Sequence, residues 1–179
     1  MFIESIKFSK EIIMKLLVTG GTGFIGSHLV KKLNNSGHKV VVIDKAQAIN
    51  PLPGVAYYKE DITDYHATKT IYKGVDQVFH MAAEASITAC IEEPLRATNV
   101  NVVGTATVLQ CAKEANVSRV IYSSTSAAYG KNITPNTEDQ IENCLNPYAL
   151  SKVVGEKFCS MFSDLYGLET VVLRYLRLW

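Results

Sequence analysis

A tyrosine and a lysine four positions apart, Tyr148 and Lys152, are the side chains in this sequence best suited to acid–base chemistry. On a helix, positions i and i+4 share a face, so the phenol and the ammonium can reach one site. A nearby positive charge lowers the pKa of a phenol, which makes it a usable base near neutral pH. The same spacing also arises by chance, and both side chains are then simply solvated.

Hydroxyl side chains at Ser123, Ser124 and Thr125 strengthen the case for a site at this tyrosine. They end or directly follow the apolar run at residues 119–123, which predicts a strand. A hydroxyl at that strand end can hydrogen-bond a substrate oxygen beside the tyrosine. The alternative interpretation is ordinary turn chemistry, in which the hydroxyls bond the neighbouring backbone.

A glycine-rich stretch, residues 19–26, lies between an apolar run and a helical segment. Glycines in such a turn let the backbone approach a pyrophosphate at the positive end of the helix. The spacing fits GxGxxG from Gly21, and Gly20, Gly23 and Gly26 also fit GxxGxxG. A tight turn without a ligand is the alternative, but its place between strand and helix favours a nucleotide site.

Acidic residues follow the next two predicted strands. A carboxylate at Asp44 can accept both ribose hydroxyls of an adenosine and would repel a 2′-phosphate, which favours NAD over NADP. Lys45 beside it weakens that preference, and a solvated strand end is the alternative. Asp61 and Ile62 could flank the adenine ring, although Asp61 or Thr63 could equally cap the helix that follows.

The fourth predicted strand ends in His80, Met81, Ala82 and Ala83. The small side chains would let a pyrophosphate and a nicotinamide ribose lie against the backbone. We interpret His80 as a packed, hydrogen-bonded residue, because a single histidine at a strand end is a poor candidate base.

Strands and helices alternate along the whole sequence. This pattern predicts an α/β fold, a Rossmann-like doubly wound parallel sheet with helices on both faces. In the strand order 3-2-1-4-5-6, the ligand crevice lies between strands 1 and 4. The predicted strands cover residues 15–19, 39–44, 55–59, 76–80, 119–123 and 168–175, and the predicted helices cover residues 24–35, 63–72, 94–115 and 148–166.

Composition limits the classes of function. The 179 residues suffice for one domain with a core, and 18 Lys and Arg balance 17 Asp and Glu. That balance argues against a nucleic-acid partner bound by bulk charge, leaving only a local patch. No segment is long and apolar enough to span a membrane. Four scattered cysteines without a CxxC pair favour neither zinc nor disulfides, and fit a cytoplasmic setting.

The first thirteen residues mix charged and apolar side chains and do not form a convincing signal peptide. Met14 stands directly before the first predicted strand. We therefore expect residues 1–13 to be an N-terminal extension, and residues 14–179 to form the dinucleotide-binding domain. A short helix packed on the sheet edge is the alternative for this segment.

Jointly, these motifs resemble the extended short-chain dehydrogenase/reductase family, the NAD-dependent epimerases and dehydratases of nucleotide sugars. The sequence is most similar to the UDP-glucose 4-epimerase branch. Besides the residues above, the resemblance rests on the stretches 98–105, 122–130 and 146–152, in the order and spacing of the family.

The resemblance implies a role for each matching residue. The catalytic residues would be Thr125, Tyr148 and Lys152, and the sugar would contact Ser86 and Thr125. The residues that would bind NAD are Gly20, Gly23, Phe24, Ile25, Gly26, Asp44, Asp61, Ile62, Met81, Ala82, Ala83, Asn99, Ser123, Tyr148 and Lys152.

The resemblance also implies a reaction. Dehydratases of this family carry acidic residues after the catalytic threonine, whereas here Ser126 and Ala127 follow Thr125. Dehydration is therefore disfavoured, and epimerisation by reversible hydride transfer at a nucleotide sugar, most simply a UDP-sugar, is expected. Family members commonly pair through two long helices, which implies a homodimer through residues 94–115 and 148–166.

The C-terminal end departs from the family pattern. Arg177 stands where the family has a substrate-contacting Asn, and the substrate domain that follows in the family has no counterpart before Trp179. We interpret the tail as a truncation, a change of frame or a shortened chain. We expect NAD binding without efficient turnover. The alternatives are a non-catalytic NAD-binding fragment, or a nucleotide-sugar reductase or decarboxylase of the same family.

Overall fold

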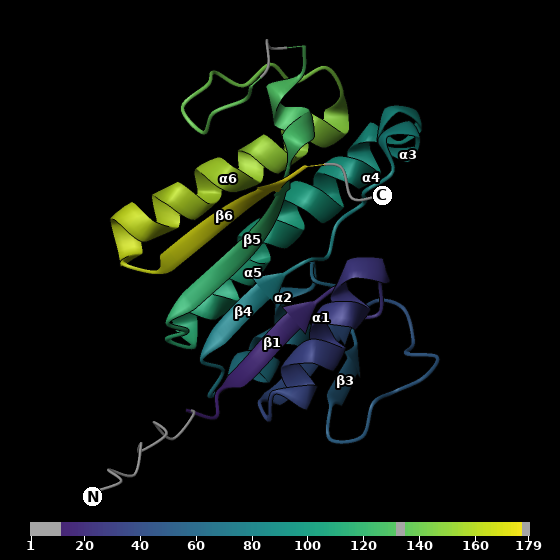
Figure 1. The fold of residues 1–179 in the computed structure, drawn as a ribbon, viewed down its shortest axis with the longest axis vertical. Helices are drawn as coiled ribbons and strands as arrows, with labels where there is room; N and C mark the ends of the chain where they lie inside the picture. The colour runs from purple at the N-terminus through teal and green to yellow at the C-terminus, as the bar shows by residue number, and fades with distance from the viewer. Residues whose placement is uncertain (1–11, 132–134, 177–179) are drawn as a thin grey trace, which may run out of the picture.

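A six-stranded parallel sheet forms the centre of the computed structural model, which describes residues 12–131 and 135–176 (Figure 1). The strand order is β3-β2-β1-β4-β5-β6, so the predicted order is confirmed. The chain reverses its direction of travel across the sheet between β1 and β4, and this leaves a crevice at their carboxyl ends. The strands are β1 (Lys15–Thr19), β2 (Lys39–Asp44), β3 (Ala56–Lys59), β4 (Gln77–His80), β5 (Arg119–Thr125) and β6 (Glu169–Tyr175).

Helices lie on both faces of this sheet (Figure 1). Residues of α5 and α6 pack with Leu17, Val78 and Val120 on one face, whereas α1 packs with Val18 and Val42 on the other. The helical segments are α1 (Phe24–Asn35), α2 (Tyr65–Thr68), η1 (Lys69–Tyr72), α3 (Ile87–Glu92), α4 (Pro94–Thr98), η2 (Asn99–Val103), α5 (Gly104–Glu114), η3 (Ser126–Tyr129) and α6 (Pro147–Tyr166).

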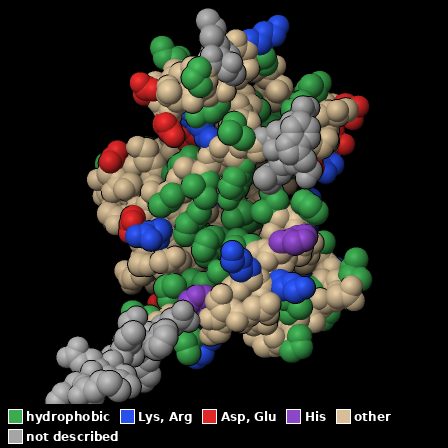
Figure 2. Space-filling model, in the orientation of Figure 1, with side chains coloured by type: hydrophobic (Ala, Val, Ile, Leu, Met, Phe, Trp, Pro, Cys, Tyr) green, Lys and Arg blue, Asp and Glu red, His purple; other side chains and the backbone are tan. Residues whose placement is uncertain are grey.

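The face that α1 covers is only partly covered by the described residues. Leu16 and Val18 of β1 are buried under α1, but Ile121, Val171 and Leu173 farther along the sheet are not. Strand register places Ile121 beside Val171, so these side chains line one continuous surface. Figure 2 shows apolar side chains gathered over β4, β5 and β6. We call Ile121, Val171 and Leu173 the open sheet face.

The predicted helix at residues 94–115 is interrupted in the middle. Its α-helical ends, α4 and α5, are joined by a π-helical segment, η2. A π turn inserts an extra residue into the helical repeat, so it rotates the side chains that precede it relative to those that follow. Which polar residue of η2 points inward therefore depends on this turn.

The predicted helix at residues 63–72 begins later than expected. Asp64 is its N-cap, because its carboxylate accepts the Ala67 N–H at 3.0 Å. Asp61 instead accepts the N–H and hydroxyl of Thr63, at 2.9 and 2.8 Å, in the turn before the helix. The prediction that Asp61 or Thr63 caps this helix was wrong, since a local turn uses both residues.

Both ends of the sequence lie partly outside the described residues. Most of the predicted extension at residues 1–13 and the divergent residue Arg177 belong to the ranges that are not described. The boundary at Met14 stays a prediction. In the described part, no helix is long and apolar enough to cross a bilayer, and no group of His, Cys, Asp and Glu could hold a metal ion. All four cysteines are free thiols.

Candidate active site

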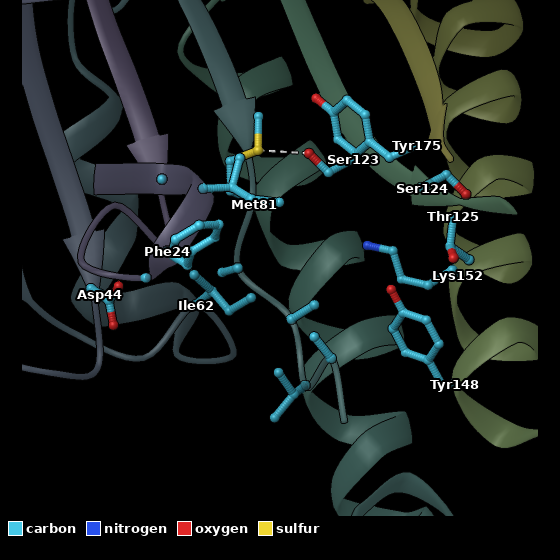
Figure 3. Close-up of a pocket in the computed structure, with 18 of the residues that line it drawn as sticks. Phe24, Asp44, Ile62, Met81, Ser123, Ser124, Thr125, Tyr148, Lys152 and Tyr175 are labelled. Atoms are coloured by element: carbon cyan, nitrogen blue, oxygen red, sulfur yellow. Dashed lines mark hydrogen bonds between the residues drawn. The ribbon is translucent and has the colours of Figure 1, made fainter. Parts of the chain in front are cut away.

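A cavity of about 1120 Å³ opens at the carboxyl ends of the strands (Figure 3). The predicted crevice between β1 and β4 is part of it, which follows from the reversal of strand order there. Its lining residues include Gly20, Gly23, Phe24, Ile25, Gly26, Asp44, Asp61, Ile62, Met81, Ala82, Ala83, Ser123, Ser124, Thr125, Tyr148, Lys152 and Tyr175.

Two glycines of the glycine-rich stretch, one in the turn before α1 and one in the first turn of α1, are required by packing. Gly20 has φ of +70°, and a Cβ there would lie 2.7 Å from the backbone N and Cα of Ala82. At Gly26, a Cβ would collide with the carbonyl oxygen of Gly20. These glycines let β1, β4 and α1 come close together, whatever ligand is bound.

Gly23 is less closely packed than these two glycines. It is the N-cap of α1 with φ of −72°, which any residue can adopt, and a Cβ would meet only the Gly20 carbonyl oxygen, at 3.3 Å. Gly23 is exposed and lines the cavity. No side chain caps α1, so its first N–H groups are left for an anion at this point.

Asp44 holds two loops at the same end of the cavity. Its carboxylate accepts the Thr22 N–H at 3.0 Å and the Ala46 N–H at 2.9 Å. The carboxylate is thereby oriented in the cavity wall, with acceptor capacity left on both oxygens. Asp61 and the buried Ile62 line the wall nearby.

His80 lies beneath the cavity rather than in it. The ring is buried, with Nδ1 2.7 Å from the hydroxyl of Thr19 and Nε2 3.0 Å from the hydroxyl of Thr105. Burial, together with the charge of Lys152, lowers the pKa of His80 to about 3. The imidazole is therefore neutral, and the interpretation of His80 as a packed residue is confirmed.

The far end of the cavity brings together Thr125, Tyr148 and Lys152 (Figure 3). Thr125 comes from the end of β5, where its hydroxyl accepts the Ala127 N–H at 3.1 Å. Tyr148 and Lys152 come from successive turns of α6, which begins at the N-cap Asn146. The topology therefore places the predicted phenol, ammonium and hydroxyl at one site.

Burial controls the protonation of the phenol. It raises the pKa of Tyr148, and a hydrogen bond with the Thr125 side chain only partly offsets this effect. In the protein without ligand, the pKa of Tyr148 therefore lies above its ordinary value, and the lowering by Lys152 stays a prediction. The reason is that a phenolate in this half-buried position loses more hydration than its surroundings replace.

Lys152 is only 3% exposed, although its side chain reaches the cavity. Its Nζ lies 4.2 Å from the centre of the Tyr122 ring, a cation–π contact. Burial lowers the pKa of Lys152 to about 7. The ammonium can therefore lose its proton near neutral pH.

Two predicted residues do not line the cavity. Asn99 is exposed on η2, where Val100 reaches the wall instead. Ser86 is also exposed, and its hydroxyl caps α3 by accepting the Ala89 N–H at 3.2 Å. The neighbouring Ile87 lines the wall.

The inward-facing polar residue of η2 is Asn101, which is 1% exposed. Its amide accepts the Glu84 N–H at 2.8 Å and donates to the Glu84 carbonyl at 3.0 Å and the Ser151 hydroxyl at 2.9 Å. Asn101 thus ties the loop after β4 to α6, next to Lys152. The sequence offers two asparagines here, and only the π turn decides between them.

Several wall residues escaped the sequence analysis. Tyr175 could have been found, because the carboxyl ends of all parallel strands meet at one edge and Tyr175 ends β6. Ala85, Ile87 and Val100 carry no such signal, since loop and π-turn geometry bring them to the wall.

Comparison with known proteins agrees with this geometry. The family described as "NAD dependent epimerase/dehydratase family" matches residues 16–178. The UDP-glucose 4-epimerase of Halalkalibacterium halodurans is 36% identical over 167 residues, covering 90% of this chain and 50% of the relative.

Solved structures show the same likeness. The UDP-glucose 4-epimerase of Thermotoga maritima with UDP-glucose has a TM-score of 0.87 at 36% identity, covering 90% of this chain and 55% of that one. The Thermus thermophilus UDP-glucose 4-epimerase in complex with NAD has a TM-score of 0.86 at 33% identity, with the same coverage of 90% and 55%. The chain spans about half the length of the relatives it matches. The match over residues 16–178 shows that it belongs to the NAD dependent epimerase/dehydratase family.

Proposed function

We propose that this chain is the cofactor-binding half of an NAD-dependent nucleotide-sugar 4-epimerase, similar to the UDP-glucose 4-epimerases. One observation carries the proposal: a single cavity joins the glycine turn before α1 to Thr125, Tyr148 and Lys152. A dinucleotide-binding turn at one end and acid–base groups at the other suit hydride transfer at a sugar carbon.

The residues present fit NAD. Gly23 lines the cavity, a Cβ there would meet only the Gly20 carbonyl oxygen, and the first N–H groups of α1 have no side-chain cap. Asp44 is held in the wall at the same end, with lone pairs for ribose hydroxyls. Gly20, Phe24, Ile25, Gly26, Asp61, Ile62, Met81, Ala82, Ala83 and Ser123 complete the proposed binding site.

NAD, when bound, supplies reversible hydride transfer. Tyr148 would take the proton of a sugar hydroxyl, because its phenol lies in the cavity and is hydrogen-bonded by Thr125. Thr125 would orient the oxygen that loses the proton. Lys152 would bind ribose hydroxyls, and its ammonium would stabilise the phenolate that burial alone disfavours.

The distribution of carboxylates supports epimerisation over dehydration. Ser126 and Ala127 follow Thr125 in the cavity wall, and neither can act as an acid or base to expel water. The acidic residues of the described lining, Asp44, Glu60 and Asp61, come from the end that would bind adenosine.

The first experiment measures NAD binding and turnover separately. We expect calorimetry to detect NAD binding to the 179-residue chain. We expect little interconversion of UDP-galactose and UDP-glucose, because the chain spans about half the length of its relatives, and substrate must be positioned and shielded from water. Absence of NAD binding would refute the proposal. Robust turnover would show that this chain alone positions the sugar.

The half length also favours a second candidate, a non-catalytic NAD-binding fragment. NAD binding without reduction of the cofactor by any of several UDP- and dTDP-sugars would support this candidate. Net consumption of NADH with one sugar would instead indicate a reductase of the family, and release of CO2 from a sugar acid would indicate a decarboxylase. Ser86 and Asn99 remain predicted contacts for substrate and cofactor, and their alanine variants belong in the same assays.

We also propose a cytoplasmic homodimer. The four free thiols fit a reducing compartment. The two long helical segments expose apolar side chains, among them Leu95, which is 86% exposed on α4, and Leu150 on α6. Light scattering tests the dimer, and a monomer at all concentrations would refute it.

A further inference from the structure

Glu156 is a buried carboxylate to which the proposed reaction gives no role. It lies on α6, one turn beyond Lys152 and two turns beyond Tyr148. Positions i, i+4 and i+8 share one helix face, so the carboxylate follows the phenol and the ammonium along the same stripe. It is only 9% exposed, and a carboxylate at such a position needs strong partners to remain charged.

Those partners come from two strands. From β6, Arg174 donates to both carboxylate oxygens of Glu156, from Nε at 2.9 Å and from Nη2 at 2.6 Å. From β5, the Ser124 hydroxyl donates to the same carboxylate. The guanidinium of Arg174 also lies 4.9 Å from the centre of the Tyr129 ring. Glu156 therefore joins α6 to the ends of β5 and β6, directly beside Thr125.

We propose that Glu156 is a positioning residue of this site: it ties the Thr125 turn to α6 through Ser124, and its negative charge increases the fraction of Lys152 that is in the ammonium form. The proposal rests on the proposed function for its significance, because the ammonium matters where Lys152 holds ribose and stabilises a phenolate. The contacts themselves exist without any ligand.

The charge around Lys152 supports this role. Burial drives the pKa of Lys152 down, while the charges of Cys159 and Glu156 oppose it. Burial raises the pKa of the Cys159 thiol to about 12, so this thiol carries no charge near neutral pH. Glu156 is then the anion that acts on the ammonium. The groups that face Lys152 are Tyr148, Glu156 and Cys159 from α6, Tyr122 from β5 and His80 from β4.

The positive charge of Arg174 lies beside the negative charge of Glu156 and partly offsets it. The pKa of Arg174 is raised well above the ordinary value by its hydrogen bond with Glu156, so this side chain is always charged. It fixes the carboxylate in place and also offsets part of its field. Removing Glu156 and removing Arg174 should therefore shift the titration midpoint of Lys152 differently, although each substitution breaks the same ion pair.

The test measures the titration of Lys152 directly, without ligand. The chain is labelled at lysine Cε and Nζ, and the NMR signal of Lys152 is assigned by its absence in Lys152→Met. In Glu156→Gln, whose amide can still accept from Ser124, we expect the midpoint to fall by at least about 0.5 pH unit, a threefold change in acidity. A purely structural role would loosen the packing, hydrate the ammonium and move the midpoint upward, toward the ordinary value of lysine.

Glu142→Gln is the matched control. Glu142 also pairs with Arg174, at 3.3 Å, and with Lys157, at 2.8 Å, but it comes from the loop before α6 rather than from the face that carries Lys152. We expect this variant to leave the Lys152 midpoint unchanged. An unchanged or higher midpoint in Glu156→Gln, or an equal fall in both variants, would overturn the proposal.

A second pair of variants tests the proposal if Glu156→Gln does not fold. The double variant Glu156→Gln/Arg174→Gln removes both charges and leaves no buried ion without its partner. Compared with Arg174→Gln alone, it should show the lower Lys152 midpoint, and equal midpoints would overturn the proposal. NAD binding by the parent chain is measured separately, so a failure of the proposed function is distinguishable from a failure of this coupling.

Discussion

At the scale of single residues, the glycine turn separates requirements of the fold from requirements of a ligand. A Cβ at Gly20 or Gly26 would collide with backbone atoms, whereas a Cβ at Gly23, which lines the cavity, would meet only the Gly20 carbonyl oxygen, at 3.3 Å. Of the three glycines of the motif, we therefore expect only Gly23 to be required for binding a ligand rather than for the fold. The distinction rests on what a Cβ would touch, which spacing alone does not reveal.

Gly23→Val should abolish NAD binding while the chain stays folded. The added side chain can adopt the φ of −72°, and it projects where a pyrophosphate would approach. Calorimetry measures the affinity, and circular dichroism the fold. Gly26→Val is the comparison variant, since its side chain collides with Gly20 and should reduce stability. Unchanged affinity in Gly23→Val would show that the binding site is misplaced.

Lys152→Met should stabilise the chain, and more at pH 6 than at pH 9. Burial lowers the pKa of Lys152 from 10.5 to about 7, so between these values the unfolded chain binds the proton that the folded chain has released. The free energy of unfolding of the unsubstituted chain therefore rises with pH between about 7 and 10.5. Below this range, the buried ammonium destabilises the folded chain by its full amount. Methionine at this position carries no charge, so we expect the free energy of unfolding to rise by about 1–3 kcal/mol at pH 6.

Urea unfolding at both pH values gives the measurement. Lys157→Met is the control on the same helix, because its side chain is 67% exposed and its loss should shift stability equally at both pH values. A stabilisation by Lys152→Met that grows with pH would contradict the assignment of the buried charge.

At the scale of elements, the π turn η2 and the crossover helix α6 position the site. η2 turns Asn101 toward the loop after β4, and α6 carries Tyr148, Lys152 and Glu156 along one face. Asn101 links the two by bonding both Glu84 and Ser151. The wall of the cavity is therefore held by bonds between elements, not by any one loop.

Asn101→Ala should lower the free energy of unfolding by about 1–3 kcal/mol, because the backbone of Glu84 and the hydroxyl of Ser151 lose their hydrogen bonds to its amide. Asn99→Ala, two positions earlier on the exposed side, should change stability by less than about 0.5 kcal/mol. Urea denaturation compares the two variants. Equal losses would show that the π turn does not select Asn101.

At the scale of the whole molecule, the sheet is covered unequally. Parallel sheets are normally covered on both faces, but the open sheet face has no covering element among residues 12–131 and 135–176. An apolar surface of this kind promotes association with other chains or binding of hydrophobic probes. The half length relative to the matching epimerases is consistent with this exposure.

Leu173→Lys should reduce self-association and binding of a hydrophobic dye. Leu173 is 37% exposed on the edge strand β6, so a charge there can reach water while it interrupts the apolar patch. Light scattering and dye fluorescence are the measurements. Leu95→Lys is the matched variant on α4, and it should weaken a dimer through the helices without changing dye binding to the sheet. The reverse pattern would contradict the assignment of the two surfaces.

The sequence by itself determined the architecture and most of the residues that share the cavity. Runs of β-branched residues, glycines at the ends of elements and helical periodicity are local signals that predict the strands and helices. Right-handed crossovers between successive strands then lead to the strand order 3-2-1-4-5-6. Because all parallel strands end at one edge, Gly23, Asp44, Thr125 and Tyr148 were predicted to meet there, and all four line the cavity.

Only the tertiary structure decided how these groups behave. The raised pKa of Tyr148 and the lowered pKa of Lys152 depend on desolvation, which requires the packed surroundings to be known. The inward position of Asn101 depends on a π turn, and the partner of Glu156 comes from a strand 18 positions away in sequence. Such properties arise from contacts between distant parts of the chain, so no local pattern encodes them.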